Sequence, residues 1–325
     1  PPFFVREDGE RLERHAADLA GGDWVYVPRE LRETAADGGV AALSDDESPT
    51  APDDDAVSPA LASVLGYLAG DGNVYYERSE GVYGIRFTNA QAQLLTDFEE
   101  SCRAAFDTEP VRPPSEQRAD GVETVRVPGK QYADTVLDAG MNLEMYDGKR
   151  LPESVTESSR AAKAAFLRAL ADSEGTVDDR HVRLHSSSYE LLLGAKQLLL
   201  EFGICSQLQT RTRSEGRDVH TLTITDADSL RAFARHVGFT LDRKQRALAA
   251  VVERVSGERT VLDVIPSCGD LLADCRDSLR LYQSECGLDD ATYCNFENED
   301  ANISLRCARV VLERFETRRH EATAD

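Results

Sequence analysis

The chain has 325 residues with 59 acidic and 37 basic side chains, which gives a net charge of −22. This length allows two or three domains, and the absence of an apolar run of about 20 residues excludes an ordinary membrane-spanning helix. Strong acidity argues against nucleic-acid binding, because proteins that bind nucleic acids usually carry a basic surface. No signal peptide is recognised, so we expect a cytoplasmic protein with no membrane partner.

The acidity also has a second interpretation. Only five of the basic residues are lysine, and abundant acid with little lysine and much alanine resembles the proteins of extreme halophiles. At molar salt the Debye length falls to about 3 Å, so repulsion between an acidic surface and DNA is screened. Local arginines can then contact DNA, with little contribution from counterion release.

In chain order, residues 1–43 are expected to form a small β-rich segment. Residues 44–58 contain two acidic triplets, at 45–47 and 53–55, together with prolines. This composition predicts an acidic linker.

Residues 64–72 read VLGYLAGDG, an apolar helical stretch that ends in Asp71 and a glycine. Gly66 and Gly70 are four residues apart and therefore share one face of a helix. Small residues at this spacing allow another helix to approach closely. Gly72 is expected to stop the helix in the left-handed conformation.

Residues 166–175 read FLRALADSEG and repeat this pattern, with Ala169 and Ser173 four apart and Glu174 before the terminal Gly175. An acid and a glycine after an apolar helix arise often by chance, so one copy alone is weak. Pairing of the two helices would bring Asp71 and Glu174 together, where they repel unless a cation neutralises them. Oxygen ligands with open positions suit magnesium.

The similarity extends beyond the two helices. GIRFTN at 84–89 corresponds to HVRLHS at 181–186, and TVRV at 124–127 corresponds to TLTI at 221–224, both at an offset of 97. Each half is predicted to contain a helix, two strands, a helix, two strands and a helix. The strands alternate between apolar and polar residues. Their polar face can bind base edges or phosphates, although alternation alone favours an ordinary solvated face.

These motifs resemble the LAGLIDADG (dodecapeptide) homing endonucleases over residues 58–255. In that family the acid before the last glycine binds metal, which assigns Asp71 and Glu174 to Mg²⁺ or Mn²⁺. Asp172 is not counted as a ligand. A Lys-x-hydrophobic-Pro block at 149–152, KRLP, is typical of intein-encoded members and assigns a catalytic role to Lys149. Lys244 is a candidate counterpart, although its offset of 95 departs from that of the repeat.

The resemblance implies an α+β fold in which two pseudo-symmetric αββαββα halves, 59–150 and 151–255, form a saddle over double-stranded DNA. The implied activity is site-specific double-strand cleavage by a monomer. Candidate DNA contacts are Arg86, Arg126, Arg183, Gln209, Arg211 and Arg213. Two alternatives stay open: a DNA-binding module that has lost cleavage, and an internal part of an intein that matters only for protein splicing.

The flanks resemble an intein rather than a free-standing endonuclease. Residues 19–31, LAGGDWVYVPREL, are similar to the splicing-domain segment that precedes an inserted endonuclease. Residues 1–5 resemble the residues that directly follow a splicing block. The nucleophile and His-Asn pair needed for splicing are missing, so splicing by this fragment is not expected. The flanking host protein is expected to be a replication protein, such as a minichromosome maintenance helicase.

Residues 256–325 are expected to form a separate helical module, with its main helices at 270–283 and 304–319. Five of the seven cysteines follow residue 267 without a Cys-x-x-Cys pair, so zinc is poorly supported. His181, His185 and His220 are interpreted as surface or DNA-contacting residues on strands.

Overall fold

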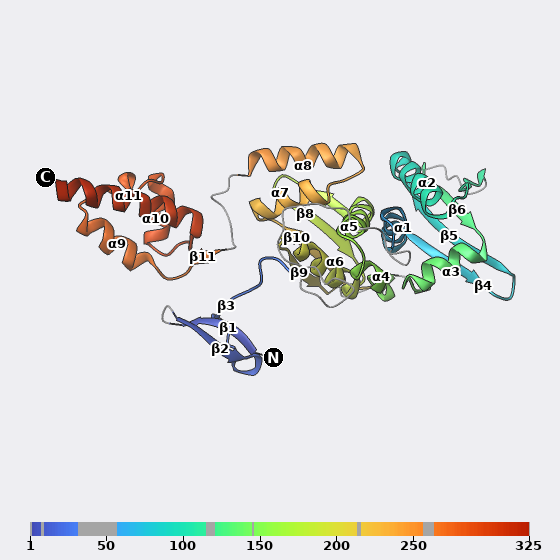
Figure 1. Cartoon of the computed structure of the whole chain (residues 1–325), viewed down its shortest axis with the longest axis horizontal. Helices are drawn as coiled ribbons and strands as arrows, with labels where there is room; N and C mark the ends of the chain where they lie inside the picture. The colour runs from blue at the N-terminus through green and yellow to red at the C-terminus, as the bar shows by residue number, and fades with distance from the viewer. Residues whose placement is uncertain are drawn as a thin grey trace.

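Two helices pack side by side, and each is followed by an antiparallel sheet (Figure 1). The computed structural model describes residues 2–7, 10–31, 57–114, 121–144, 146–212, 216–255 and 263–324. Helices α1 (Pro59–Ala69) and α5 (Arg160–Glu174) begin at serine caps. The Oγ atoms of Ser58 and Ser159 accept hydrogen bonds from backbone N–H groups of the first turn, which satisfies donors that have no partner within the helix.

The first sheet follows α1 and has the order β4 (Gly72–Glu77), β5 (Val82–Asn89), β6 (Glu123–Pro128). Helices α2 (Ala92–Phe106) and α3 (Lys130–Asp138) complete this segment. A fourth strand is expected before β6, but the described residues there form only a bridge between Val111 and Arg126. Residues 115–120 lie outside the described ranges.

The second sheet follows α5 and has the order β7 (Gly175–Val177), β8 (Val182–Ser186), β10 (Val219–Ile224), β9 (Gln207–Arg211). Helices α6 (Tyr189–Glu201), α7 (Ala227–His236) and α8 (Asp242–Arg254) pack with it, and the short α4 (Glu153–Thr156) precedes α5. From α5 to α7 the elements follow the predicted order of helix, two strands, helix, two strands and helix.

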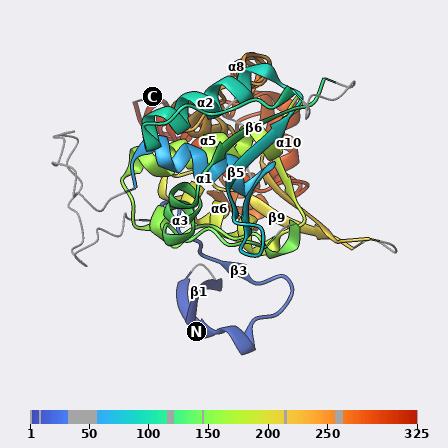
Figure 2. The same ribbon diagram turned by 90° about the vertical axis from the view of Figure 1, so that its right-hand side faces the viewer.

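One apolar core joins both sheets to the central helices, because strand side chains alternate between two faces. Inward positions such as Ile85 and Phe87 in β5 and Leu222 in β10 are completely buried. A lysine also enters this core: Lys163 of α5 is 1% exposed and forms an ion pair with Glu201 of α6 at 2.6 Å. Viewed from the end, α1 and α5 again lie next to each other (Figure 2).

The described residues before 32 form a small sheet in the order β2 (Glu10–His15), β1 (Pro2–Glu7), β3 (Trp24–Val25). Of the expected linker at 44–58, only residues 57 and 58 lie within the described ranges. No helix in the described ranges is long and apolar enough to cross a membrane.

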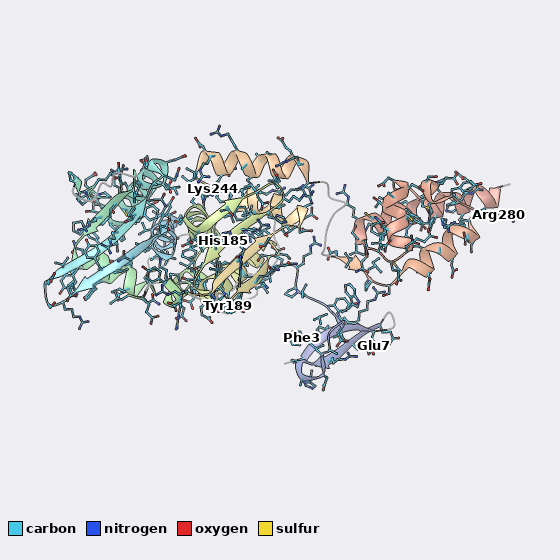
Figure 3. The ribbon with its side chains drawn as sticks, turned by 180° about the vertical axis from the view of Figure 1, so that it is seen from behind. Phe3, Glu7, His185, Tyr189, Lys244 and Arg280 are labelled. Atoms are coloured by element: carbon cyan, nitrogen blue, oxygen red, sulfur yellow. The ribbon has the colours of Figure 1, made fainter. Side chains whose placement is uncertain are left out.

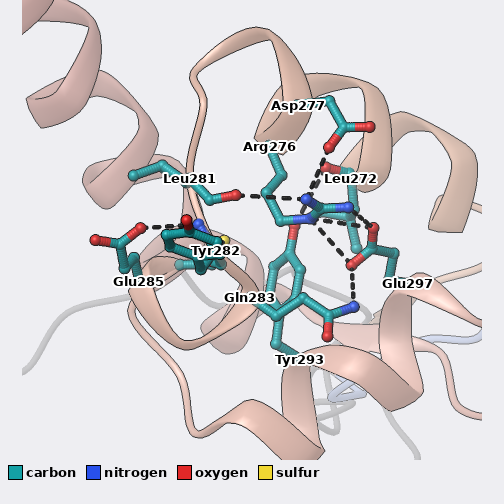
Figure 4. A network of polar contacts seen from close by, with 10 residues as sticks. Leu272, Arg276, Asp277, Leu281, Tyr282, Gln283, Glu285, Tyr293 and Glu297 are labelled. Carbon is teal, nitrogen blue, oxygen red and sulfur yellow. Dashed lines mark hydrogen bonds and ion pairs between the residues drawn. The ribbon is translucent and has the colours of Figure 1, made fainter.

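The C-terminal residues form helices α9 (Gly269–Ser278), α10 (Asp290–Glu297) and α11 (Leu305–Ala324), with strands β11 (Val264–Ile265) and β12 (Ile303–Ser304). They have their own core around Tyr293 and Cys307. The guanidinium of Arg276 binds Glu297 at 2.6 Å, and Gln283 also donates to this carboxylate (Figure 4). The helix expected over 270–283 ends at Ser278, because Arg280 adopts a left-handed conformation with φ 57°.

Candidate functional site

The two motif helices touch through their small residues, as the spacing predicts. A Cβ atom added to Gly66 would lie 2.8 Å from the Cβ of Ala169, and one added to Gly70 would lie 2.8 Å from the Oγ of Ser173. These distances are below van der Waals contact, so only glycine fits at both positions. The close approach places the C-terminal ends of α1 and α5 next to each other.

The terminal glycines act differently from the prediction. Gly72 and Gly175 do not close the helices in a left-handed conformation, since Gly72 begins β4 and Gly175 has φ −94° and begins β7. A Cβ at Gly72 would lie 2.9 Å from the carbonyl oxygen of Arg86 on the neighbouring strand. The glycines are therefore needed for tight packing where each helix turns directly into its sheet.

Asp71 and Glu174 lie at these adjacent helix ends. Asp71 keeps solvent contact, and its Oδ2 accepts a hydrogen bond from the side-chain amide of Asn89 at 2.8 Å. Burial, followed by the negative charge of Asp71, raises the pKa of Glu174 to about 7. Burial also raises the pKa of Asp71. The two carboxylates are therefore close enough for the charge of one to perturb the other.

Lys149 precedes the second motif in sequence, but its ammonium contacts the end of the first motif helix. Its Nζ donates to the carbonyl oxygens of Leu68 at 3.2 Å, Gly72 at 3.1 Å, and Gly70. Three acceptors match the three N–H groups of an ammonium. Burial lowers the pKa of Lys149, while the charges of Glu174 and Asp71 act in the opposite direction. Lys149 thus caps α1 within electrostatic reach of both acids.

Lys244 caps the second motif helix in the same way. It lies in the first turn of α8 (Figure 3), and its Nζ donates to the carbonyl oxygens of Ala171 at 3.1 Å and Asp172 at 2.6 Å. Burial lowers its pKa to about 8. The carboxylate of Asp172 accepts hydrogen bonds from the backbone N–H groups of Thr240 at 2.7 Å and Leu241 at 3.1 Å. Asp172 therefore holds the chain that carries Lys244.

The donor chemistry of this site fits a divalent cation. Asp71 and Glu174 supply carboxylate oxygens, and their pKa values are raised because burial destabilises their ionised forms. A bound cation would relieve this destabilisation. Among the described residues, no group of three or more His, Cys, Asp or Glu side chains could hold a metal ion.

The polar face of the first sheet carries two of the predicted DNA contacts. Arg86 of β5 and Arg126 of β6 are directly opposite each other, and both are half-buried. The Nε of Arg86 donates to Asn73 at 2.7 Å. Strand β5 ends at Asn89, whose side-chain amide donates to Asp71, so the end of this strand lies beside the acidic pair.

The second sheet places Arg183, Gln209 and Arg211 on one face, opposite a buried face that includes Leu184 and Leu222. Gln209 and Arg211 are exposed, whereas Arg183 is half-buried and paired with Asp178. Arg213 lies outside the described residues.

The positions of three further polar residues, Asn89, His185 and His220, follow from the fold. Asn89 was not identified from sequence, although it ends the predicted strand that follows the first motif. His185 lies on the polar face of the second sheet (Figure 3), where its Nδ1 is 3.2 Å from the Oγ1 of Thr221. His220 is only 8% exposed and binds Thr210 at 2.8 Å, so its interpretation as a surface residue is wrong. The sequence signal for this position is that His220 is two residues before the buried Leu222 and therefore shares its face of the strand.

Several known proteins contain segments that are similar in sequence to this chain. A replication factor C small subunit of Methanocaldococcus jannaschii is 28% identical over 86% of this chain and 14% of the relative. A glutamine–fructose-6-phosphate aminotransferase of the same organism is 24% identical over 62% of this chain and 18% of the relative. A replicative DNA helicase DnaB of Rhodothermus marinus is 26% identical over 78% of this chain and 26% of the relative. The chain thus spans about a quarter or less of each of these relatives.

Among solved structures, the homing endonuclease I-DmoI in complex with DNA and Mn is similar with a TM-score of 0.44 and 18% identity, over 55% of this chain and 96% of that one. The homing endonuclease I-WcaI bound to its DNA recognition sequence has a TM-score of 0.42 and 10% identity, over 59% and 87%. Residues 161–238 match the family model of a LAGLIDADG-like domain. The matched residues include most of the second motif helix α5 and the sheet that follows it.

Proposed function

We propose that this chain is a site-specific, divalent-metal-dependent DNA endonuclease that makes a double-strand break. The observation that carries the proposal is the meeting of Asp71 and Glu174 at the adjacent ends of two tightly packed helices, each of which is followed by a sheet. Burial raises the pKa of each acid, so a cation that binds the ionised pair would offset the cost of keeping both charges there. The LAGLIDADG-like domain over residues 161–238 supports the same activity.

Asp71 and Glu174 would hold one or more Mg²⁺ or Mn²⁺ ions, which supply an activated water and charge stabilisation for the leaving oxygen. Asn89 orients the carboxylate of Asp71 through its hydrogen bond. Lys149 and Lys244 hold the two helix ends, and both would place positive charge near the scissile phosphate. Arg86, Arg126, Arg183, Gln209 and Arg211 would bind the DNA on either side, with Arg213 as a further candidate.

We also propose that the chain is part of an intein inserted in a larger host protein, in a halophilic archaeon. The same segment aligns inside a replication factor, an aminotransferase and a helicase, each several times longer than the aligned region. Proteins with such different names are the expected hosts of a mobile element. The small sheet β2-β1-β3 is consistent with a splicing-domain remnant, and the host is proposed to be a replication protein.

The test is cleavage of a library of candidate duplexes, including the uninterrupted gene of a proposed host, by the full chain in molar KCl. Reactions contain Mg²⁺, Mn²⁺ or a chelator. The Asp71→Asn and Glu174→Gln variants are assayed beside the parent, with Asp134→Asn as a control acid, since Asp134 binds Lys130 on α3 away from the helix ends. We expect metal-dependent cleavage by the parent and the control, and its loss in both site variants.

Each other outcome has a distinct meaning. Binding without cleavage by the parent would replace the proposal with a DNA-binding module. Cleavage that persists in both site variants would refute the assignment of the metal ligands. If the parent neither binds nor cleaves any duplex, the remaining alternative is a part of an intein that matters only for protein splicing. Reconstitution with the flanking segments would test that alternative.

A further inference from the structure

A hollow of about 480 Å³ opens on the polar face of the first sheet. It is lined at its mouth and walls by Tyr75, Val82, Val111, Pro113, Arg126 and Pro128. The hollow interrupts an otherwise polar strand face, since the neighbouring outward positions of β5 and β6 are Arg86, Thr88 and Thr124. An apolar depression therefore lies in the surface that we propose to contact DNA.

The floor of the hollow depends on a glycine. Tyr75, Gly84 and Pro128 occupy one row across β4, β5 and β6. A Cβ at Gly84 would lie 2.6 Å from the Cζ of Tyr75, so the hydroxyl end of the tyrosine ring can approach the middle strand only because residue 84 has no side chain. This arrangement makes an aromatic platform where a larger residue would project.

The walls combine exposed apolar groups with a cation. The side chains of Val82 and Val111 are 46% and 48% exposed, respectively, although both are β-branched aliphatic residues. The guanidinium of Arg126 lies 5.9 Å from the centre of the Tyr75 ring. The hollow thus offers an apolar surface next to a positively charged donor group.

The second sheet has a different surface chemistry. The outward residues of β9 are Gln207, Gln209 and Arg211, and Val219 of β10 is the aliphatic residue paired with Arg211. Gln207, Gln209 and Arg211 are exposed and polar. The two sheets therefore present different groups to a ligand that contacts both.

We propose that the hollow receives the 5-methyl group of a thymine in the major groove, with Arg126 at the adjacent base edge or phosphate; this inference rests on the DNA-binding function proposed above. The thymine methyl is the apolar group that base pairs expose in the major groove, and the minor groove presents none. Arg126 complements the negative charge of DNA. The first sheet thereby specifies a thymine in its half of the target, whereas the second sheet reads hydrogen-bonding groups.

The test measures binding of the full chain to its target duplex in Ca²⁺, with deoxyuridine replacing thymidine in one half-site at a time. Deoxyuridine keeps every hydrogen-bonding group and removes only the methyl. We expect one half-site to be sensitive, with affinity reduced about fourfold for each buried methyl, the ratio that corresponds to about 0.8 kcal/mol. A 5-methylcytosine placed at the same position should bind more tightly than cytosine.

The Val82→Thr/Val111→Thr double variant should lose this discrimination, because it replaces apolar methyls with hydroxyls at exposed strand positions. Val219→Thr is the matched control on the second sheet and should keep it. Melting curves verify that both variants fold. Tight binding with no effect of deoxyuridine in either half-site would overturn this inference alone. Failure of the parent to bind any DNA would overturn the proposed function as well.

Discussion

The ammonium of Lys244 donates a hydrogen bond of 2.6 Å to the backbone carbonyl of Asp172, while the Asp172 side chain binds the backbone just before α8. Each residue thus holds the element that carries the other. Lys149 makes the corresponding contact with the end of α1 from a loop, but α1 has Ala69 at the position of Asp172 in α5, so that position offers no carboxylate to hold the loop. The two acids are held by related but unequal supports.

These contacts predict that the lysines position the acids. Replacing Lys244 or Lys149 with Met leaves buried carbonyl oxygens without a donor, a cost of about 1–3 kcal/mol. We expect the affinity for Mn²⁺, measured without DNA, to fall about tenfold, which is about 1.4 kcal/mol. Arginine should restore part of it. The control is Lys196→Met on α6, and unchanged Mn²⁺ affinity in both lysine variants would contradict the positioning role.

The acid pair should make the protein less stable as the pH rises. The pKa of Glu174 is raised from 4.5 to about 7, so between these values the folded state holds a proton that the unfolded state has released. The free energy of unfolding therefore decreases with pH across this window. Glu174→Gln should increase the free energy of unfolding by about 1–3 kcal/mol near pH 8 and leave it unchanged near pH 4. Urea titrations at both pH values measure this, and destabilisation at the higher pH would contradict it.

Divalent cations should reverse this effect. When Asp71 and Glu174 are ionised, a bound cation favours the folded state, by about 2.7 kcal/mol at a concentration of 100 times Kd. At pH values above the pKa of Glu174, we expect Mg²⁺ or Mn²⁺ to raise Tm. At pH values well below that pKa, we expect either ion to have little effect on Tm. The Asp71→Asn/Glu174→Gln double variant is the control. An equal metal-induced shift in that variant would place the cation elsewhere.

The contact between the motif helices predicts the effect of a single methyl group. Gly66→Ala would drive a Cβ into α5 near Ala169, so we expect a loss of about 1–3 kcal/mol of stability, as in other overpacked cores. Gly21→Ala is the control, because nothing lies within 4 Å of a Cβ there. Equal melting temperatures for the two variants would show that the helices can separate at little cost.

The buried ion pair between Lys163 and Glu201 predicts a non-additive result. Lys163→Met leaves the Glu201 carboxylate, which is 12% exposed, without its partner. We expect a cost of about 3–5 kcal/mol, and the Lys163→Met/Glu201→Leu double variant should recover much of it. Denaturant titrations of all four proteins give the coupling energy. A double variant as unstable as the sum of the single changes would rule out the expected coupling.

Local patterns were sufficient to predict the helix pairing. The four-residue spacing of Gly66 and Gly70 is a property of the helical repeat, so it identifies a contact face without knowledge of the partner. Strand alternation likewise assigned Arg86, Gln209 and Arg211 to outward faces. The same rule predicts that His220 lies on the inner face, because it is two residues from Leu222 in the same strand. The polar chemistry of histidine suggested a surface position instead.

Other features depended on contacts between distant parts of the chain. The position of Lys149 before the second motif gave no indication that its ammonium caps the first motif helix. The role of Gly72 could not be predicted either, because the reason for its lack of a side chain is the carbonyl of Arg86 on the next strand. The hollow at Tyr75 required the register that places Gly84 beneath the ring.

The sequence by itself determined the small-residue faces of the two motif helices and the order of elements from α5 to α7, because these follow from helical and strand periods along the chain. Only the tertiary structure decided which helix end each lysine caps, how far the pKa of Glu174 is raised, and where the first sheet becomes apolar. Those properties depend on distances through space and on the exclusion of water, and both are determined only when the two segments pack around α1 and α5.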